Sequence, residues 1–293
     1  MKSVPDVVVA RTARPMRAHV SSLLLSAAMG VLLLGASPAE AGAYIPVAGS
    51  GDVSAMLRYA FGDQAFSPTS FSSATYPSSK EEKTQLRVTG EEGLGSGFAL
   101  TYDLRYGFLY RSKTKHGHTT DNTNDGLQDE EVGLDYGLTQ TQAFSDALGL
   151  SLIIPGSSAV KIPGLDSGHY ALEPQYMIGF KPGFWDITGL WYAGSRVFTD
   201  GGIAQFRTEL EVEAPVLPRL DLAGKVFFVR SAQLSGYNSL KDAGERYNLL
   251  RLGVEARYKM SDGLEPFVAY EDYIAGKGGH ADQRFTLGIK LSF

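Results

Sequence analysis

The sequence of 293 residues predicts an all-β fold, namely a closed up-and-down antiparallel transmembrane β-barrel of about twelve strands. Three observations lead to this prediction. Apolar and polar side chains alternate through most of the chain after residue 50, short and long connections follow each other in turn, and many charged side chains lie on the polar face of the alternating segments. A barrel whose outside contacts lipid and whose inside contacts water needs this pattern.

The first 41 residues have the features of a signal peptide. Arg11, Arg14 and Arg17 precede an apolar run of about 14 residues, and Ala39-Glu40-Ala41 is a small-x-small cleavage site. The run is too short to cross a bilayer as a helix, which takes about 20 apolar residues. We therefore expect a signal peptide over 1–41, a short periplasmic segment over 42–50 and the barrel over 51–293.

Alternation with period two marks the strands. In the last nine residues Phe285, Leu287, Ile289, Leu291 and Phe293 alternate with polar residues or glycine. A strand points alternate side chains to opposite faces, whereas an amphipathic helix repeats its apolar residues at about 3.6. The sequence predicts strands over 52–61, 84–91, 97–111, 129–138, 143–154, 169–180, 184–198, 203–214, 219–230, 248–260, 264–274 and 282–293.

The connections between these strands fall into two classes. Those after even-numbered strands are short turns, and those after odd-numbered strands are mostly long and polar, with 199–202 as the short exception. Short periplasmic turns and long external loops are typical of outer-membrane barrels, and an even strand number places both termini at the periplasmic end. The predicted long loops are 62–83, 112–128, 155–168 and 231–247.

A soluble β-sandwich or a lipocalin-type barrel shares the alternation, but two features favour the membrane. Aromatic side chains gather at predicted strand ends, as in the girdles of lipid-facing barrels. These are Tyr59, Phe61, Tyr106, Phe108 and Tyr110 at the external end, and Tyr136, Phe180, Trp185 and Tyr258 at the periplasmic end. The second feature is the inward charge, which a dry core could not bury unpaired.

The inward charges are the candidates for controlling which solutes pass through the lumen. Glu209, Glu211 and Glu213 form an acidic row on one strand, and basic residues form rows on two later strands. These rows either face each other across the lumen, which would create a transverse field, or pair with one another. The selectivity candidates are Arg105, Arg207, Glu209, Glu211, Arg251, Arg257, Arg284 and Lys290.

Two segments resemble known families. The final strand, 284–293, resembles the C-terminal signal of Gram-negative outer-membrane barrels, which alternates and ends in an aromatic residue. This resemblance implies an outer-membrane location, contact with outer-membrane lipid, and Phe293 as the assembly signal read by the barrel-assembly machinery.

The regions 128–138 and 148–156 are similar to the transporter-type barrels of the phenol meta-pathway family, which implies uptake or export of small molecules such as aromatic compounds.

One polar segment contains residue types that bind divalent metals. It includes His116, His118, Asp121 and Asp125, but position twelve of the would-be calcium loop is Val132 instead of a bidentate Glu. We therefore expect a solvated external loop without metal, and no cofactor. No serine with an adjacent, oriented histidine base can be identified, so we expect no enzyme.

The amino-acid composition excludes several classes of protein. Lys and Arg number 27 against 32 Asp and Glu, so a nucleic-acid-binding surface is not expected. There is no cysteine, which excludes disulfide scaffolds and thiol catalysis. The predicted function is an outer-membrane channel or passive transporter for small solutes through a narrow charged lumen. Two alternatives stay open: an outer-membrane enzyme acting on lipid or peptide, and an occluded barrel whose external loops bind a partner.

Overall fold

The computed structural model describes residues 43–67, 69–74, 76–115, 118–157, 168–183, 186–199, 203–233 and 247–293. The predicted signal peptide therefore lies outside the described residues. None of the described residues forms a helix that is long and apolar enough to cross a membrane. The strands are β1 (Gly51–Ala65), β2 (Tyr76–Gly95), β3 (Phe98–Lys115), β4 (His118–Leu127), β5 (Glu130–Gln140), β6 (Phe144–Ile154), β7 (Ala171–Phe180), β8 (Thr188–Phe198), β9 (Ile203–Leu217), β10 (Leu220–Gln233), β11 (Asn248–Tyr258), β12 (Leu264–Lys277) and β13 (His280–Ser292).

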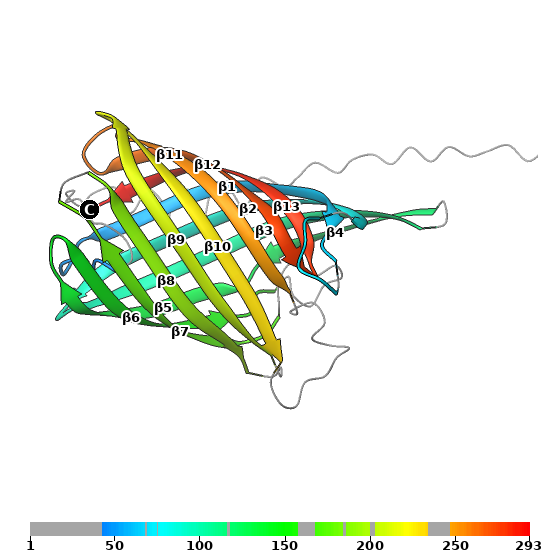
Figure 1. Ribbon diagram of the computed structural model, residues 1–293, viewed down its shortest axis with the longest axis horizontal. Coiled ribbons are helices and arrows are strands. Elements are labelled where there is room, and N and C mark those ends of the chain that lie inside the picture. Colours follow the sequence, from blue (N-terminus) through cyan, green and yellow to red (C-terminus); the bar gives the residue numbers. More distant parts are fainter. Residues whose placement is uncertain are drawn as a thin grey trace, which may run out of the picture. The chain divides into compact units, whose positions relative to one another are not determined.

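Twelve of these strands form a closed antiparallel barrel, as the sequence predicts (Figure 1). Each strand of the ring pairs with its neighbours in the chain, and β1 closes the ring by pairing with β2 on one edge and with β13 on the other. Closure matters in lipid, because an open sheet edge would leave backbone groups without hydrogen-bond partners.

The thirteenth strand, β4, lies outside this ring. It pairs with Tyr106–Lys115 of β3, whereas β5 pairs with Phe98–Asp103 of the same strand. Figure 1 shows the hairpin of β3 and β4 extending past the ends of the other strands. The predicted loop over 112–128 is therefore wrong in part, and so is the loop over 62–83, because β2 already begins at Tyr76. Residues 118–123 are exposed, so no apolar face marks this segment as a strand.

Alternation along the strands separates a lipid-facing surface from a lumen. On β6, Leu148, Leu150 and Leu152 are 41–52% exposed, whereas Ser151 and Ile153 are buried. Large apolar side chains are exposed in the same way on the other strands of the ring, for example Leu287 on β13 at 61%. A water-soluble protein would not expose an apolar surface of this extent, so the outer face fits lipid and not a β-sandwich core.

The two ends of the barrel differ. β1 begins and β13 ends at the same end of the barrel, where Gly51 and Phe293 exchange backbone hydrogen bonds of 3.0 Å, and the turns after β2, β5, β7, β9 and β11 lie there as well. We call it the terminal end, and the opposite one the loop end. At the loop end β12 and β13 are joined by only Gly278 and Gly279, with φ of 67° and 76°, which suit a tight hairpin turn. The sequence predicts a longer connection, over 275–281, but β12 and β13 both continue further than the alternation indicates.

The aromatic residues expected at strand ends are partly exposed. Tyr59, Phe108, Tyr136, Phe180 and Tyr258 are 36–46% exposed on the outer surface. Trp185 lies outside the described residues. Aromatic rings exposed on the outer surface are what the girdles of membrane barrels contain.

The lipid-facing surface generates a test. Replacing Leu150 with arginine places a charge against lipid, which costs about 2–4 kcal/mol near the bilayer midplane. We expect a lower urea midpoint for unfolding from lipid vesicles. The control is Thr101→Arg, because Thr101 lines the lumen; an equal loss of stability in both variants would contradict the assignment of faces.

Candidate functional site

The interior of the barrel contains two cavities. Their volumes are about 710 and about 400 Å³, and the smaller one extends toward the terminal end. Both are lined by inward side chains of the strands, and the two share part of their lining: Asp52, Arg58, Arg87, Thr89, Lys225 and Glu271. The two cavities therefore lie next to each other along the barrel interior, which we call the lumen.

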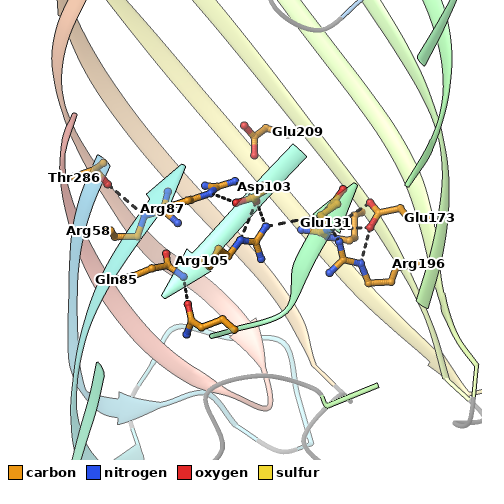
Figure 2. A network of polar contacts seen from close by, with 12 residues as sticks. Arg58, Gln85, Arg87, Asp103, Arg105, Glu131, Glu173, Arg196, Glu209 and Thr286 are labelled. Atoms are coloured by element: carbon orange, nitrogen blue, oxygen red, sulfur yellow. Dashed lines mark hydrogen bonds and ion pairs between the residues drawn. The ribbon is translucent and has the colours of Figure 1, made fainter. Parts of the chain in front are cut away.

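A band of charged side chains surrounds this lumen. Figure 2 shows part of it as one layer across the barrel interior. The band lies at the height in the barrel where inward positions of most strands meet. Lipid-facing residues flank such positions along the strand, for example Leu57 and Tyr59 on either side of Arg58. We call it the charged belt, and it consists of Arg58, Arg87, Asp103, Arg105, Glu131, Glu173, Arg196, Arg207, Glu209, Arg251, Glu271 and Arg284.

One half of the charged belt is tightly paired. Arg87 donates hydrogen bonds of 2.8 and 2.7 Å to Asp103, and Arg105 also donates to Asp103. Arg196 and Arg207 both donate to Glu173, at 2.6 and 2.8 Å. The side chain of Glu173 is only 2% exposed. A carboxylate this buried is stable only with charged partners, and here it has two.

The other half is more loosely paired. Glu271 lies 3.4 Å from Arg251 and 3.9 Å from Arg58, and Arg251 lies 3.4 Å from Glu209. Arg284 lies 4.0 Å from Asp282 and donates a hydrogen bond of 3.0 Å to the Tyr273 hydroxyl. These distances exceed those of the first half, so the guanidinium groups on β1, β11 and β13 are less fully neutralised.

A second cluster lies nearer the terminal end. Arg257 contacts Glu211 at 2.7 Å, Glu255 at 2.5 Å and also Glu213. Lys225 lies 3.0 Å from Glu211 and 2.9 Å from Glu255. Three carboxylates thus surround two cations, and this part of the lumen is net acidic. We call these five residues the second cluster.

The structure places all eight selectivity candidates on the lumen. Arg105, Arg207, Glu209, Arg251 and Arg284 belong to the charged belt. Glu211 and Arg257 belong to the second cluster, and Lys290 lies 3.2 Å from Asp52. The acidic row on β9 and the basic residues of β11 flank the same strand, β10, so they pair along the wall instead of facing each other across the lumen.

Seven charged residues of the belt are not among the eight selectivity candidates: Arg58, Arg87, Asp103, Glu131, Glu173, Arg196 and Glu271. Each lies at an inward position of a predicted strand. The alternation of side chains along those strands assigns all seven to the lumen, so the sequence contains the signal that identifies them.

The metal candidates lie away from the lumen. Asp121 and Asp125 are on the β3–β4 hairpin, where Tyr110 and Tyr106 donate hydrogen bonds to them at 3.1 and 3.0 Å. His118 is exposed at the start of β4, and His116 lies outside the described residues. Within the part of the chain that the structure describes, no group of three or more such side chains is placed to bind a metal ion.

Residues 43–45, part of the segment expected to be periplasmic, lie against the inner wall of the barrel, and residues 46–50 continue past the end of β2 to β1. The Gln140 side chain donates a hydrogen bond of 2.9 Å to the Ala43 carbonyl and accepts one of 3.1 Å from the Ile45 amide. Ala43 is 1% exposed and packs on inward residues of β6 and β7. A Cβ on Gly179 would lie 2.4 Å from the Tyr44 ring, so the wall leaves room for this segment. We call residues 43–50 the N-terminal strap.

The tight half of the belt generates a stability test. Glu173→Gln removes the charge shared by Arg196 and Arg207, and breaking such a buried pairing costs about 3–5 kcal/mol. Glu209→Gln is the matched control, because Glu209 is 28% exposed and its ion pair with Arg251, at 3.4 Å, is worth less than about 1 kcal/mol. Urea unfolding in lipid vesicles measures both, and similar losses would show that belt pairing does not control stability.

Comparison with solved structures defines the fold. The structure is similar to the crystal structure of an outer membrane channel from Pseudomonas putida F1, with a TM-score of 0.67 and 13% identity over 87% of this chain and 100% of that chain. It is also similar to the NanC porin, with a TM-score of 0.51 and 11% identity over 82% and 100%. No family model and no curated protein matches the chain, so the resemblance to the phenol meta-pathway barrels stays a prediction. The chain has the β-barrel fold of outer-membrane channels and porins.

Proposed function

We propose that the protein is a channel of the bacterial outer membrane through which small polar solutes diffuse passively. The observation that carries the proposal is the contrast between the two faces of the barrel. The outer face exposes leucine, valine and phenylalanine side chains, and the inner face presents paired charges around cavities of about 710 and 400 Å³. Charges in this number need water around them, and water inside a barrel provides a path for solutes.

Two elements narrow this path and favour small solutes. At the terminal end the N-terminal strap occupies part of the inner wall. At the loop end Phe66, which follows β1, is 2% exposed and packs on Phe227, Val229 and Leu249 from the inner face. A barrel of twelve strands lies between those filled by side chains and those with a wide aqueous channel, so such elements decide its effective width.

The remaining expectations belong to the same proposal. The leader over 1–41 exports the chain, the terminal end faces the periplasm, and β13 with Phe293 is recognised by the barrel-assembly machinery. Phe293 supports this role by its place, since its backbone pairs with Gly51 where the ring closes. The two similar structures, an outer membrane channel and a porin, support a channel for this chain.

The proposal predicts ion conductance. The full chain, expressed in a Gram-negative host without its major porins and extracted from the outer membrane, should give discrete current steps in a planar lipid bilayer. A gel shift on heating checks that the barrel is folded. A folded barrel that stays silent in the bilayer would refute the channel.

The N-terminal strap predicts a second effect on conductance. Gln140→Ala removes the two side-chain hydrogen bonds that hold Ala43 and Ile45 of the strap on the wall, together worth about 2 kcal/mol, and leaves the leader unchanged. We expect a larger and noisier single-channel current, because the strap leaves the wall more often. Gln142→Ala, in the same turn, is the matched control. If both variants conduct like the parent, the strap does not limit the pore.

A further inference from the structure

The loosely paired half of the charged belt concentrates positive charge. Arg58, Arg251 and Arg284 come from three different strands and converge on the region of Glu271. The carboxylate of Glu271 is no closer than 3.4 Å to any of them, whereas Glu173 on the opposite wall has partners at 2.6 and 2.8 Å. The carboxylates within 4.0 Å of these three arginines are Glu209, Glu271 and Asp282, and none of them is closer than 3.4 Å. The charge of these arginines is therefore the least closely neutralised in the belt.

An apolar cluster lies directly beside these arginines, on the loop-end side. It consists of the buried residues Phe66, Phe227, Val229 and Leu249, with Tyr247 and Tyr273 packed against it. The guanidinium carbon of Arg251 lies 4.4 Å from the centre of the Phe227 ring. That of Arg284 lies 4.8 Å from the centre of the Tyr273 ring. Rings in this position fix the guanidinium planes without neutralising them.

We propose that this place binds a small organic anion, with its carboxylate on the guanidinium groups and its apolar body on the cluster. We call it the arginine–aromatic site, and it comprises Arg58, Arg251, Arg284, Phe227 and Tyr273. The inference rests on the proposed channel function and names the class of solute. Its arginines and rings line the larger cavity, so a solute in the lumen reaches them.

The chemistry of the site selects this class over others. A guanidinium fork matches a carboxylate in shape and charge, so arginine is well suited to recognise it. A cation would be repelled by the three arginines, and a sugar without charge would leave the apolar cluster uncovered. The weak internal pairing also suits a channel, because a solute anion competes with ion pairs of only 3.4–4.0 Å and can leave again.

Current block in planar bilayers tests the site. The probe is cyclohexanecarboxylate, and cyclohexanecarboxamide is the neutral probe of the same shape. We expect the carboxylate to block at a concentration at least about tenfold lower than the amide does, and Arg251→Gln and Arg284→Gln each to weaken that block about tenfold. The control is Arg105→Gln, which removes an equal charge from the other half of the belt while Asp103 keeps its two bonds from Arg87; its block should change less than about twofold.

The outcomes separate this inference from the channel itself. Equal block by the two probes, or an unchanged block in Arg251→Gln and Arg284→Gln, would overturn the site while leaving the channel in place. If the folded parent passes no current, the channel proposal fails. Titration calorimetry of the detergent-solubilised protein with the same probes then decides whether the arginine–aromatic site binds the carboxylate. Heat from the carboxylate alone that disappears in Arg284→Gln supports it, and no heat from the carboxylate overturns it.

Discussion

A chain that crosses lipid as strands has to pair its backbone N–H and C=O groups within itself, because hydrocarbon offers them no partner. The barrel does so by joining β1 to β2 on one edge and to β13 on the other. Once the ring is closed, every strand has one face toward lipid and one toward the lumen, and the pleat assigns alternate residues to each. The exposed leucines of β6 and the inward arginines of β11 follow from this one requirement.

The same geometry explains why so much charge fits inside a barrel of twelve strands. Inward side chains on adjacent or next-adjacent strands are within reach of one another, as with Arg87 and Asp103, or with Glu209 and Arg251 on either side of β10. Charges therefore pair along the wall, and the centre stays open as cavities. Pairing of this kind stabilises the wall where a carboxylate is buried, as Glu173 is. Where the ion pairs are long, the charged side chains are only partly neutralised and can interact with another charged group.

Sequence alternation was sufficient to predict the closed ring, because lipid forces the period-two pattern on each strand. It predicted the inward position of Arg207, Glu209 and Arg251 for the same reason. Alternation fails where a strand has no apolar face: β4 has polar residues on both sides, and its sequence predicts a loop. It also could not decide which charges pair, since Glu211 and Arg257 are 46 positions apart and meet only through the register of β9, β10 and β11.

Several elements act in series along the lumen, and different parts of the chain supply each of them. In the proposed channel, a solute that enters at the loop end would meet the apolar cluster around Phe66 and Phe227, then the charged belt, then the net acidic second cluster, and finally the N-terminal strap. The belt and the second cluster belong to the strands of the closed ring. Phe66 and the strap belong to segments outside the strands, so the width of the proposed path could change without any change in the charges of the wall.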